Sequence, residues 1–199
     1  MESLVLASRS PRRCELLNRI GLEFITDAPD VDETCSLPAG EAVRILSRRK
    51  ADAAAASHPG CFVLAADTLV SFRDEALGKP LDPPDAVRML RMLSGQTHQV
   101  YTGVTVINPD GRVYTDSDCT DVTFASVGED EIDAYVRTGE PMDKAGAYAL
   151  QGRAGMWVTH LSGSDSSVIG LPLYLVRSLL LQAGYPLLSA GGNITKIEG

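Results

Sequence analysis

The sequence lacks the features that mark membrane, exported and disulfide-linked proteins. No apolar run approaches the roughly 20 residues that a membrane helix needs. The short apolar run at the amino terminus precedes the positive charges, which is the reverse of a secretory signal, so we expect a cytoplasmic protein without membrane contact. No CxxC pair occurs, which favours reduced thiols for all four cysteines: Cys14, Cys35, Cys61 and Cys119.

Several catalytic and cofactor motifs are also missing. The chain contains no GxSxG nucleophile elbow, no GxGxxG dinucleotide fingerprint and no GxxxxGK[ST] phosphate loop. Its three histidines, His58, His98 and His160, lack the spacing of metal ligands. These absences argue against a serine hydrolase, a dinucleotide-dependent enzyme, a P-loop enzyme and a histidine-held metal.

Basic residues are in the minority. The chain has 18 Lys and Arg against 26 Asp and Glu, a net charge of −8 at pH 7. Because a general nucleic-acid binder presents a basic face to phosphates, this balance argues against one. A local basic cluster can still bind a small anion, and an acidic protein that binds a triphosphate often places a divalent cation between the two. With 199 residues, 44% of them hydrophobic, the chain can form one domain or two small lobes that share a cleft.

Strand and helix patterns are mixed along the chain. We expect strands at residues 3–7, 22–26, 61–72, 99–107 and 112–124, with a turn joining the last two. We expect helices from Ser10-Pro11 to Gly21 and at residues 39–56, 82–95, 129–138 and 170–183. This mixture predicts an α/β fold, and the hairpin predicts a mixed sheet. We assign residues 1–188 to a single domain and expect the aperiodic tail, 189–199, to be frayed.

A basic segment, Ser8 to Arg13 (SRSPRR), follows the first predicted strand and opens the first helix. Backbone N–H groups at a helix amino terminus attract anions, and the helix dipole adds to that attraction. Arginine suits phosphate because its fork donates two parallel hydrogen bonds. The alternative is a solvated helix start whose arginines face water. A cationic first turn opposes the dipole, however, so we favour a phosphate cradle.

One carboxylate, Asp67, interrupts the apolar strand VLAADTLV. A carboxylate in such a strand costs several kcal/mol unless it is paired or bound to a metal. Asp67 could bind a cation, act as a general base, or do both. Alternatively, the strand ends at an exposed bend where Asp67 caps a turn. The residues alone do not separate these interpretations.

Four further features are weaker signals. Lys79 precedes a proline, which holds it extended and could aim its ammonium group at a phosphate. Lys50, judged by its helix alone, is more typical of a solvated residue. Residues 140–152 place small residues around Gln151, which fits either close approach to a planar ligand or a tight loop. Residues 162–172 form either a binding loop or the start of the last helix.

Together these segments resemble the Maf family of nucleotide pyrophosphatases. The resemblance runs to about residue 181 through LVLASRSPRRCELL, VLAADTLV, GKPLDPPDAVRMLRMLSGQTHQVYTGV, DVTF, EIDAYVRTGEPMDKAGAYALQG and VIGLPLYLV. It implies a mixed twisted sheet with helices on both sides and two lobes around a deep cleft, as in inosine triphosphatases. It also implies a nucleoside triphosphate diphosphatase that releases a monophosphate and pyrophosphate with Mg²⁺ or Mn²⁺. A homodimer is compatible with it.

The resemblance implies roles for individual residues. Asp67 matches the proposed proton acceptor, and Asp67, Glu33 and Lys79 match catalytic positions, the two carboxylates also being the implied metal ligands. The positions around the phosphates are Ser8, Arg13, Lys50 and Lys79, and those linked to the choice of base are Arg12, Thr68 and Gln151. Two residues depart from the family pattern: Ala125 stands where an arginine is common, and Arg49 where an acidic residue is frequent.

Gln151 matches the residue at this position in the branch of the family that hydrolyses dTTP and UTP, so the sequence resembles that branch. The branch that acts on 7-methyl-GTP usually has glutamate there and an aromatic residue in place of Arg12. Uracil and thymine offer an N3–H donor beside carbonyl acceptors, which a glutamine amide can match with one acceptor and one donor. Two alternatives are a purine pyrophosphatase of the inosine-triphosphate type and a nucleotide-binding regulator of cell division.

Overall fold

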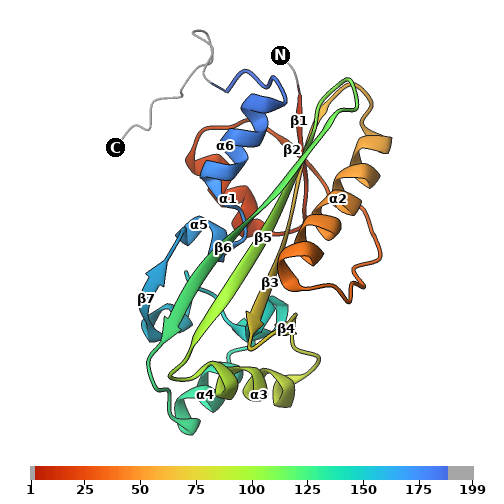
Figure 1. The fold of residues 1–199 in the computed structure, drawn as a ribbon. Helices are drawn as coiled ribbons and strands as arrows, with labels where there is room; N and C mark the ends of the chain where they lie inside the picture. Colours follow the sequence, from red (N-terminus) through yellow and green to blue (C-terminus); the bar gives the residue numbers. More distant parts are fainter. Residues whose placement is uncertain (1–2, 188–199) are drawn as a thin grey trace.

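A seven-stranded mixed sheet forms the centre of the fold (Figure 1). The computed structural model describes residues 3–187, so the predicted tail lies outside the described residues. Strand β1 is parallel to β2 and β3, whereas β3, β5, β6 and β7 pair antiparallel in that order, which confirms the predicted mixed sheet. The bounds, in sheet order, are β2 Ile25–Asp27, β1 Leu4–Ala7, β3 Phe62–Phe72, β5 Thr97–Ile107, β6 Val113–Phe124 and β7 Val158–Ser162, with β4 Glu75–Leu77 beside β3.

Helices cover both faces of one half of the sheet, as predicted (Figure 1). Successive side chains of a strand point to opposite faces, so Val5 of β1 packs with α2 while Leu4 and Leu6 pack with α1 and α6. This two-sided burial explains why LVLA is a continuous apolar run rather than an alternating one. The helices of this half are α1 Pro11–Arg19, α2 Ala39–Ser57, α5 Asp165–Ile169 and α6 Leu173–Gln182.

A second lobe covers the other half of the long strands. Its core is a separate cluster in which Leu90, Ile132 and Trp157 pack against the far parts of β3, β5 and β6. Because these strands are 11 or 12 residues long, they run through both lobes and join them. The elements of this lobe are α3 Pro83–Leu93, α4 Glu129–Val136 and the short 3₁₀ helices η1 Glu140–Asp143, η2 Ala145–Ala147 and η3 Arg153–Trp157.

The structure corrects several predicted boundaries. The strand expected at 22–26 is β2, and it occupies only Ile25–Asp27. The helix expected from residue 170 begins at Leu173, because Gly170 has a φ of 119° and ends the five-residue helix α5 instead. Strands β4 and β7 were not predicted. They are three and five residues long, and β7 is mostly exposed, so neither has an apolar alternation that could be recognised.

No helix within residues 3–187 combines the length and the apolar character that crossing a membrane requires.

Gly103 allows α2 to lie directly on the sheet. It pairs with Asp67 across β3 and β5, and a Cβ atom built there would lie 2.2 Å from the carbonyl oxygen of Val43 in α2. Because backbone cannot give way as a side-chain end can, we expect Gly103→Ala to lower the free energy of unfolding by about 1–3 kcal/mol. Urea denaturation would measure this loss.

Gly78→Ala is the matched control, since a Cβ atom there meets no atom within 4 Å. Equal stability of the two variants would contradict the tight approach of α2 to the sheet.

Candidate active site

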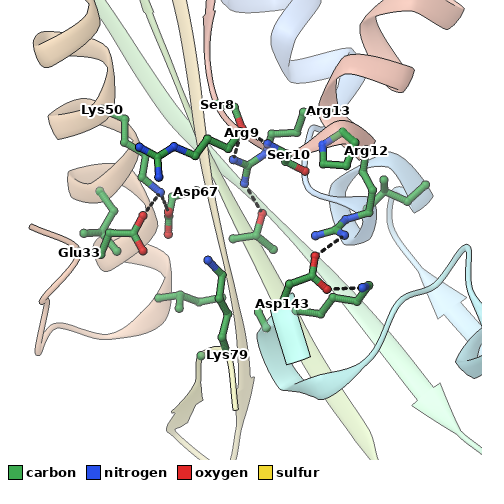
Figure 2. Close-up of a pocket in the computed structure, with 18 of the residues that line it drawn as sticks. Ser8, Arg9, Ser10, Arg12, Arg13, Glu33, Lys50, Asp67, Lys79 and Asp143 are labelled. Carbon is green, nitrogen blue, oxygen red and sulfur yellow. Dashed lines mark hydrogen bonds and ion pairs between the residues drawn. The ribbon is translucent and has the colours of Figure 1, made fainter. Parts of the chain in front are cut away.

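A cleft of about 710 Å³ lies beside the middle of β3, and both lobes line it (Figure 2). Its volume is in the range of sites for small ligands. Every site residue that the sequence predicted lies on its wall: Ser8, Arg12, Arg13, Glu33, Lys50, Asp67, Thr68, Lys79 and Gln151. These residues come from segments far apart in the sequence, so tertiary folding assembles the site.

The cleft is locally basic although the protein is acidic. Six cationic side chains line it against four carboxylates: Arg9, Arg12, Arg13, Lys50, Lys79 and Lys144 against Asp30, Glu33, Asp67 and Asp143. The ammonium group of Lys79 points into the space between the two walls (Figure 2). A small, highly charged anion is therefore the ligand that the electrostatics of this cleft favour.

The amino terminus of α1 forms one end of the cleft. Ser10 occupies the N-cap position and Pro11 follows it, as predicted, but the Ser10 side chain makes no capping hydrogen bond. The Ser8 hydroxyl instead accepts from the Ser10 amide at 3.1 Å and from Arg13 Nη1 at 3.1 Å. No acidic residue lies in the first turn of α1, so the attraction of the helix end for anions is not neutralised there.

Arg13 is held in place on several sides. Its Nε donates to the carbonyl oxygen of Gly170 at 2.8 Å, and its Nη2 donates to the Thr68 hydroxyl at 3.3 Å. Burial lowers the pKa of Arg13, and the nearby Asp67 carboxylate opposes that shift. The Thr68 hydroxyl lies 2.9 Å from that of Thr102, which donates to the Ser167 carbonyl oxygen at 2.8 Å. Thr68 therefore joins Arg13 to the sheet.

These contacts predict a different role for Thr68 from the one that the family resemblance implies. If Thr68 orients Arg13, then Thr68→Val should lower kcat/KM about fivefold to tenfold on every nucleoside triphosphate alike, the scale of one net hydrogen bond. Initial rates on dTTP, UTP and CTP would measure this. A loss confined to one base would restore the role in base selection.

A lysine joins two carboxylates at the centre of the cleft. Lys50 Nζ lies 2.5 Å from Asp67 Oδ1 and 2.7 Å from Glu33 Oε1 (Figure 2). Asp67 is 7% exposed in the middle of β3, which excludes the exposed bend considered above. The interpretation of Lys50 as a solvated helix residue is wrong, because α2 packs against β3 and turns this side chain toward Asp67. The hydrogen bond from Lys50 lowers the pKa of the Glu33 carboxyl, so Glu33 is ionised near neutral pH.

The same two carboxylates fit a divalent cation that is shared with a phosphate ligand. Within residues 3–187, no three His, Cys, Asp or Glu side chains gather into a metal site of their own. Asp67 and Glu33 nevertheless converge on one positive charge, the Lys50 ammonium. Because Mg²⁺ is commonly held by one or two carboxylates together with substrate phosphates, this pair suits such an ion.

The opposite wall of the cleft carries Gln151 in a tight turn. The Glu140 carboxylate accepts from the Arg153 amide at 3.1 Å and from the Tyr135 hydroxyl at 3.0 Å. A Cβ atom on Gly152 would lie 1.9 Å from that carboxylate, so a larger residue there would displace the Glu140 side chain from these hydrogen bonds. Among residues 3–187, no side chain or backbone group bonds to the Gln151 amide, which leaves it available to a ligand.

Known proteins are similar to this chain over nearly its whole length. The sequence profile of the family described as "Maf-like protein" matches residues 3–183. The chain belongs to the Maf family. The dTTP/UTP pyrophosphatase of Symbiobacterium thermophilum is 46% identical over 196 residues, which cover 97% of this chain and 100% of the relative. The dTTP/UTP pyrophosphatase of Myxococcus xanthus is 48% identical over 188 residues, 92% of this chain and 94% of the relative.

Solved structures share the fold of this Maf protein at low sequence identity. The Ham1 protein of Staphylococcus aureus superposes with a TM-score of 0.54 at 18% identity, over 91% of this chain and 99% of that one. A HAM1 protein of Coxiella burnetii gives a TM-score of 0.51 at 16% identity, over 92% and 100%. At these identities the likeness establishes the fold alone.

Two features of this Maf cleft were not predicted from the sequence. Asp143 lies 3.3 Å from Arg12 Nη1, an ion pair that joins the two lobes across the cleft (Figure 2). Tyr148 also lines the cleft, and its hydroxyl lies 2.9 Å from Nε2 of the buried His98. Burial lowers the pKa of His98 to about 4, so a neutral imidazole supports Tyr148. Asp143 is 131 residues from its partner, and no local pattern predicts such a contact.

Proposed function

We propose that this Maf protein is a dTTP/UTP pyrophosphatase, which hydrolyses the bond between the α and β phosphates and releases a nucleoside monophosphate and pyrophosphate. The observation that carries the proposal is the placement of the Asp67–Lys50–Glu33 group beside the basic end of α1 in one cleft. The printed names of relatives that are 46% and 48% identical support the choice of substrate.

The cationic residues bind the triphosphate in this mechanism. The amino terminus of α1 and the fixed guanidinium of Arg13 hold phosphate oxygens, and Lys79 approaches from the other lobe. Charge develops on the leaving pyrophosphate as the bond breaks, so positive groups already in position stabilise that state without reorganising.

Asp67 is the proposed proton acceptor. The Lys50 bond uses Oδ1 of Asp67, which leaves Oδ2 to take a proton from water. The water oxygen bonds to the α phosphorus, and the bridging oxygen leaves with pyrophosphate. A Mg²⁺ or Mn²⁺ held by Asp67 and Glu33 together with the phosphates would neutralise part of the triphosphate charge.

Gln151 and Arg12 are the proposed base-reading residues. The Gln151 amide offers one acceptor and one donor, which matches the N3–H and an adjacent carbonyl of uracil or thymine. Arg12 lines the cleft and is paired with Asp143. Since uracil and thymine share this edge, one site would serve both UTP and dTTP.

A nucleotide panel tests the proposal. We expect pyrophosphate release from dTTP and UTP with Mg²⁺ or Mn²⁺, weaker release from ITP and 7-methyl-GTP, and none with a chelator. Preference for a purine would overturn the base assignment and favour the inosine-triphosphate-type alternative. Binding without turnover on any nucleotide would overturn the pyrophosphatase and favour the regulatory alternative. Release of orthophosphate instead would place hydrolysis at another bond.

A further inference from the structure

Glu33 lies in a segment without helix or strand. Residues 28–38 connect β2 to α2, and the Glu33 side chain is 56% exposed. Fixing the backbone of an irregular segment costs conformational entropy, so an exposed carboxylate on it needs other contacts to stay aimed at the cleft. The Lys50 ammonium holds the carboxylate end, and Lys50 is also paired with Asp67.

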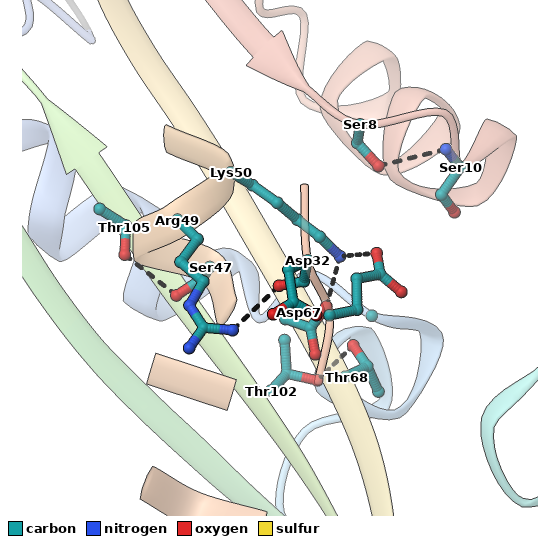
Figure 3. A network of polar contacts seen from close by, with 12 residues as sticks. Ser8, Ser10, Asp32, Ser47, Arg49, Lys50, Asp67, Thr68, Thr102 and Thr105 are labelled. Atoms are coloured by element: carbon teal, nitrogen blue, oxygen red, sulfur yellow. Dashed lines mark hydrogen bonds and ion pairs between the residues drawn. The ribbon is translucent and has the colours of Figure 1, made fainter. Parts of the chain in front are cut away.

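One arginine holds the backbone on both sides of Glu33. Arg49 Nη1 donates to the carbonyl oxygen of Asp32 at 2.9 Å and to that of Thr34 at 2.9 Å. Asp32 Oδ1 also accepts from the Thr34 amide at 2.8 Å, which closes a turn around Glu33. Figure 3 shows Arg49 and Lys50, neighbours in α2, reaching this segment and the central carboxylates.

We infer that Arg49 is a positioning residue for Glu33, an inference that rests on the pyrophosphatase proposed above. Among the described residues Arg49 does not line the cleft, so it would act on the reaction through Glu33 and not by touching the nucleotide. Arginine suits this task because its guanidinium is always charged and planar, and its bonds to neutral carbonyl oxygens are charge-assisted. We call the two hydrogen bonds from Arg49 to the carbonyl oxygens of Asp32 and Thr34 the clamp. The clamp and the ion pair of Lys50 with Glu33 together determine where the Glu33 carboxylate lies.

The chain provides a matched control in the preceding residue. Arg48 is also an exposed arginine of α2, but it pairs with Asp52 at 2.8 Å on the same helix and does not contact residues 28–38 in the described structure. Arg49→Met and Arg48→Met therefore remove the same charge and keep the same aliphatic stem. Only the first removes the clamp.

Two measurements on the full chain test the clamp. In hydrogen exchange, peptides that cover residues 28–38 should exchange about tenfold faster or more in Arg49→Met and should be unchanged in Arg48→Met. With UTP and Mn²⁺, Arg49→Met should lower kcat about fivefold to fiftyfold, the scale of one or two charge-assisted hydrogen bonds, with a smaller change in KM. Arg49→Lys, which keeps a charged donor, should recover part of the loss.

A double-mutant cycle shows whether Arg49 acts through Glu33. In a Glu33→Gln background, Arg49→Met should cost less than about twofold further, because the group that it positions is already disabled. Equal losses in both backgrounds, or unchanged exchange at residues 28–38, would overturn the inference. Absence of turnover by the wild-type chain would overturn the proposed function instead, and the exchange measurement would still decide the clamp.

Discussion

Asp67→Asn is expected to lower kcat on dTTP and UTP by about 10² or more, the scale of losing a general base or a metal ligand. Asparagine has nearly the same shape, but it cannot take the proton of an attacking water and is a poor ligand for Mg²⁺. Asp67 is the most buried carboxylate of the cleft and lies in the middle of a strand that both lobes share. Steady-state kinetics with both nucleotides would measure the loss.

The fold should survive this substitution. Lys50 remains paired with Glu33 at 2.7 Å, so the substitution does not leave the Lys50 charge without a partner. The melting temperature and the affinity for a non-hydrolysable UTP analogue should therefore stay close to wild type. Asp52→Asn, an exposed carboxylate on α2 that pairs with Arg48, is the matched control and should keep full activity. Near-normal turnover by folded Asp67→Asn would remove Asp67 from the mechanism.

Gln151→Glu is expected to lower kcat/KM on UTP and dTTP by roughly tenfold to a few hundredfold. The glutamate carboxylate lacks the N–H donor of the glutamine amide, so a carbonyl of the base would lose its partner. A polar group left unpaired in the site costs about 1–3 kcal/mol. On 7-methyl-GTP the loss should be smaller, because a carboxylate suits the adjacent donors of a guanine edge. A full change of specificity also needs Arg12 altered, since a purine must fit by shape.

The control for this prediction is Gln182→Glu, the same change on the exposed face of α6, where the side chain bonds to Ser178. It should leave the rates on all three nucleotides unchanged. If Gln151→Glu instead lost the same factor on all three, Gln151 would support the turn above Glu140 and not read the base.

The fold was largely predictable because its signals are local. The four-residue apolar run LVLA, the Asp82-Pro83 helix start and the turn between β5 and β6 each depend on neighbouring residues. Asp82 does accept a hydrogen bond from the Asp85 amide, as a helix cap should. Signals failed where elements were too short or too exposed to show a period, as in β4, α5 and β7.

The sequence by itself determined the class of the protein, an α/β fold, and, through long motifs, the Maf family. It also predicts a phosphate cradle at the start of α1. It could not determine which side chains meet, because the decisive contacts join residues distant along the chain. From the sequence, Asp67 was equally compatible with a functional carboxylate in a buried strand and with a turn cap at an exposed bend. Its burial and its strand pairing with Gly103 exclude the second interpretation. Lys50 and Arg49 had no role that their helix could predict. Packing of α2 on the sheet turns Lys50 toward Asp67 and Arg49 toward the backbone around Glu33. Only the tertiary structure specifies that packing.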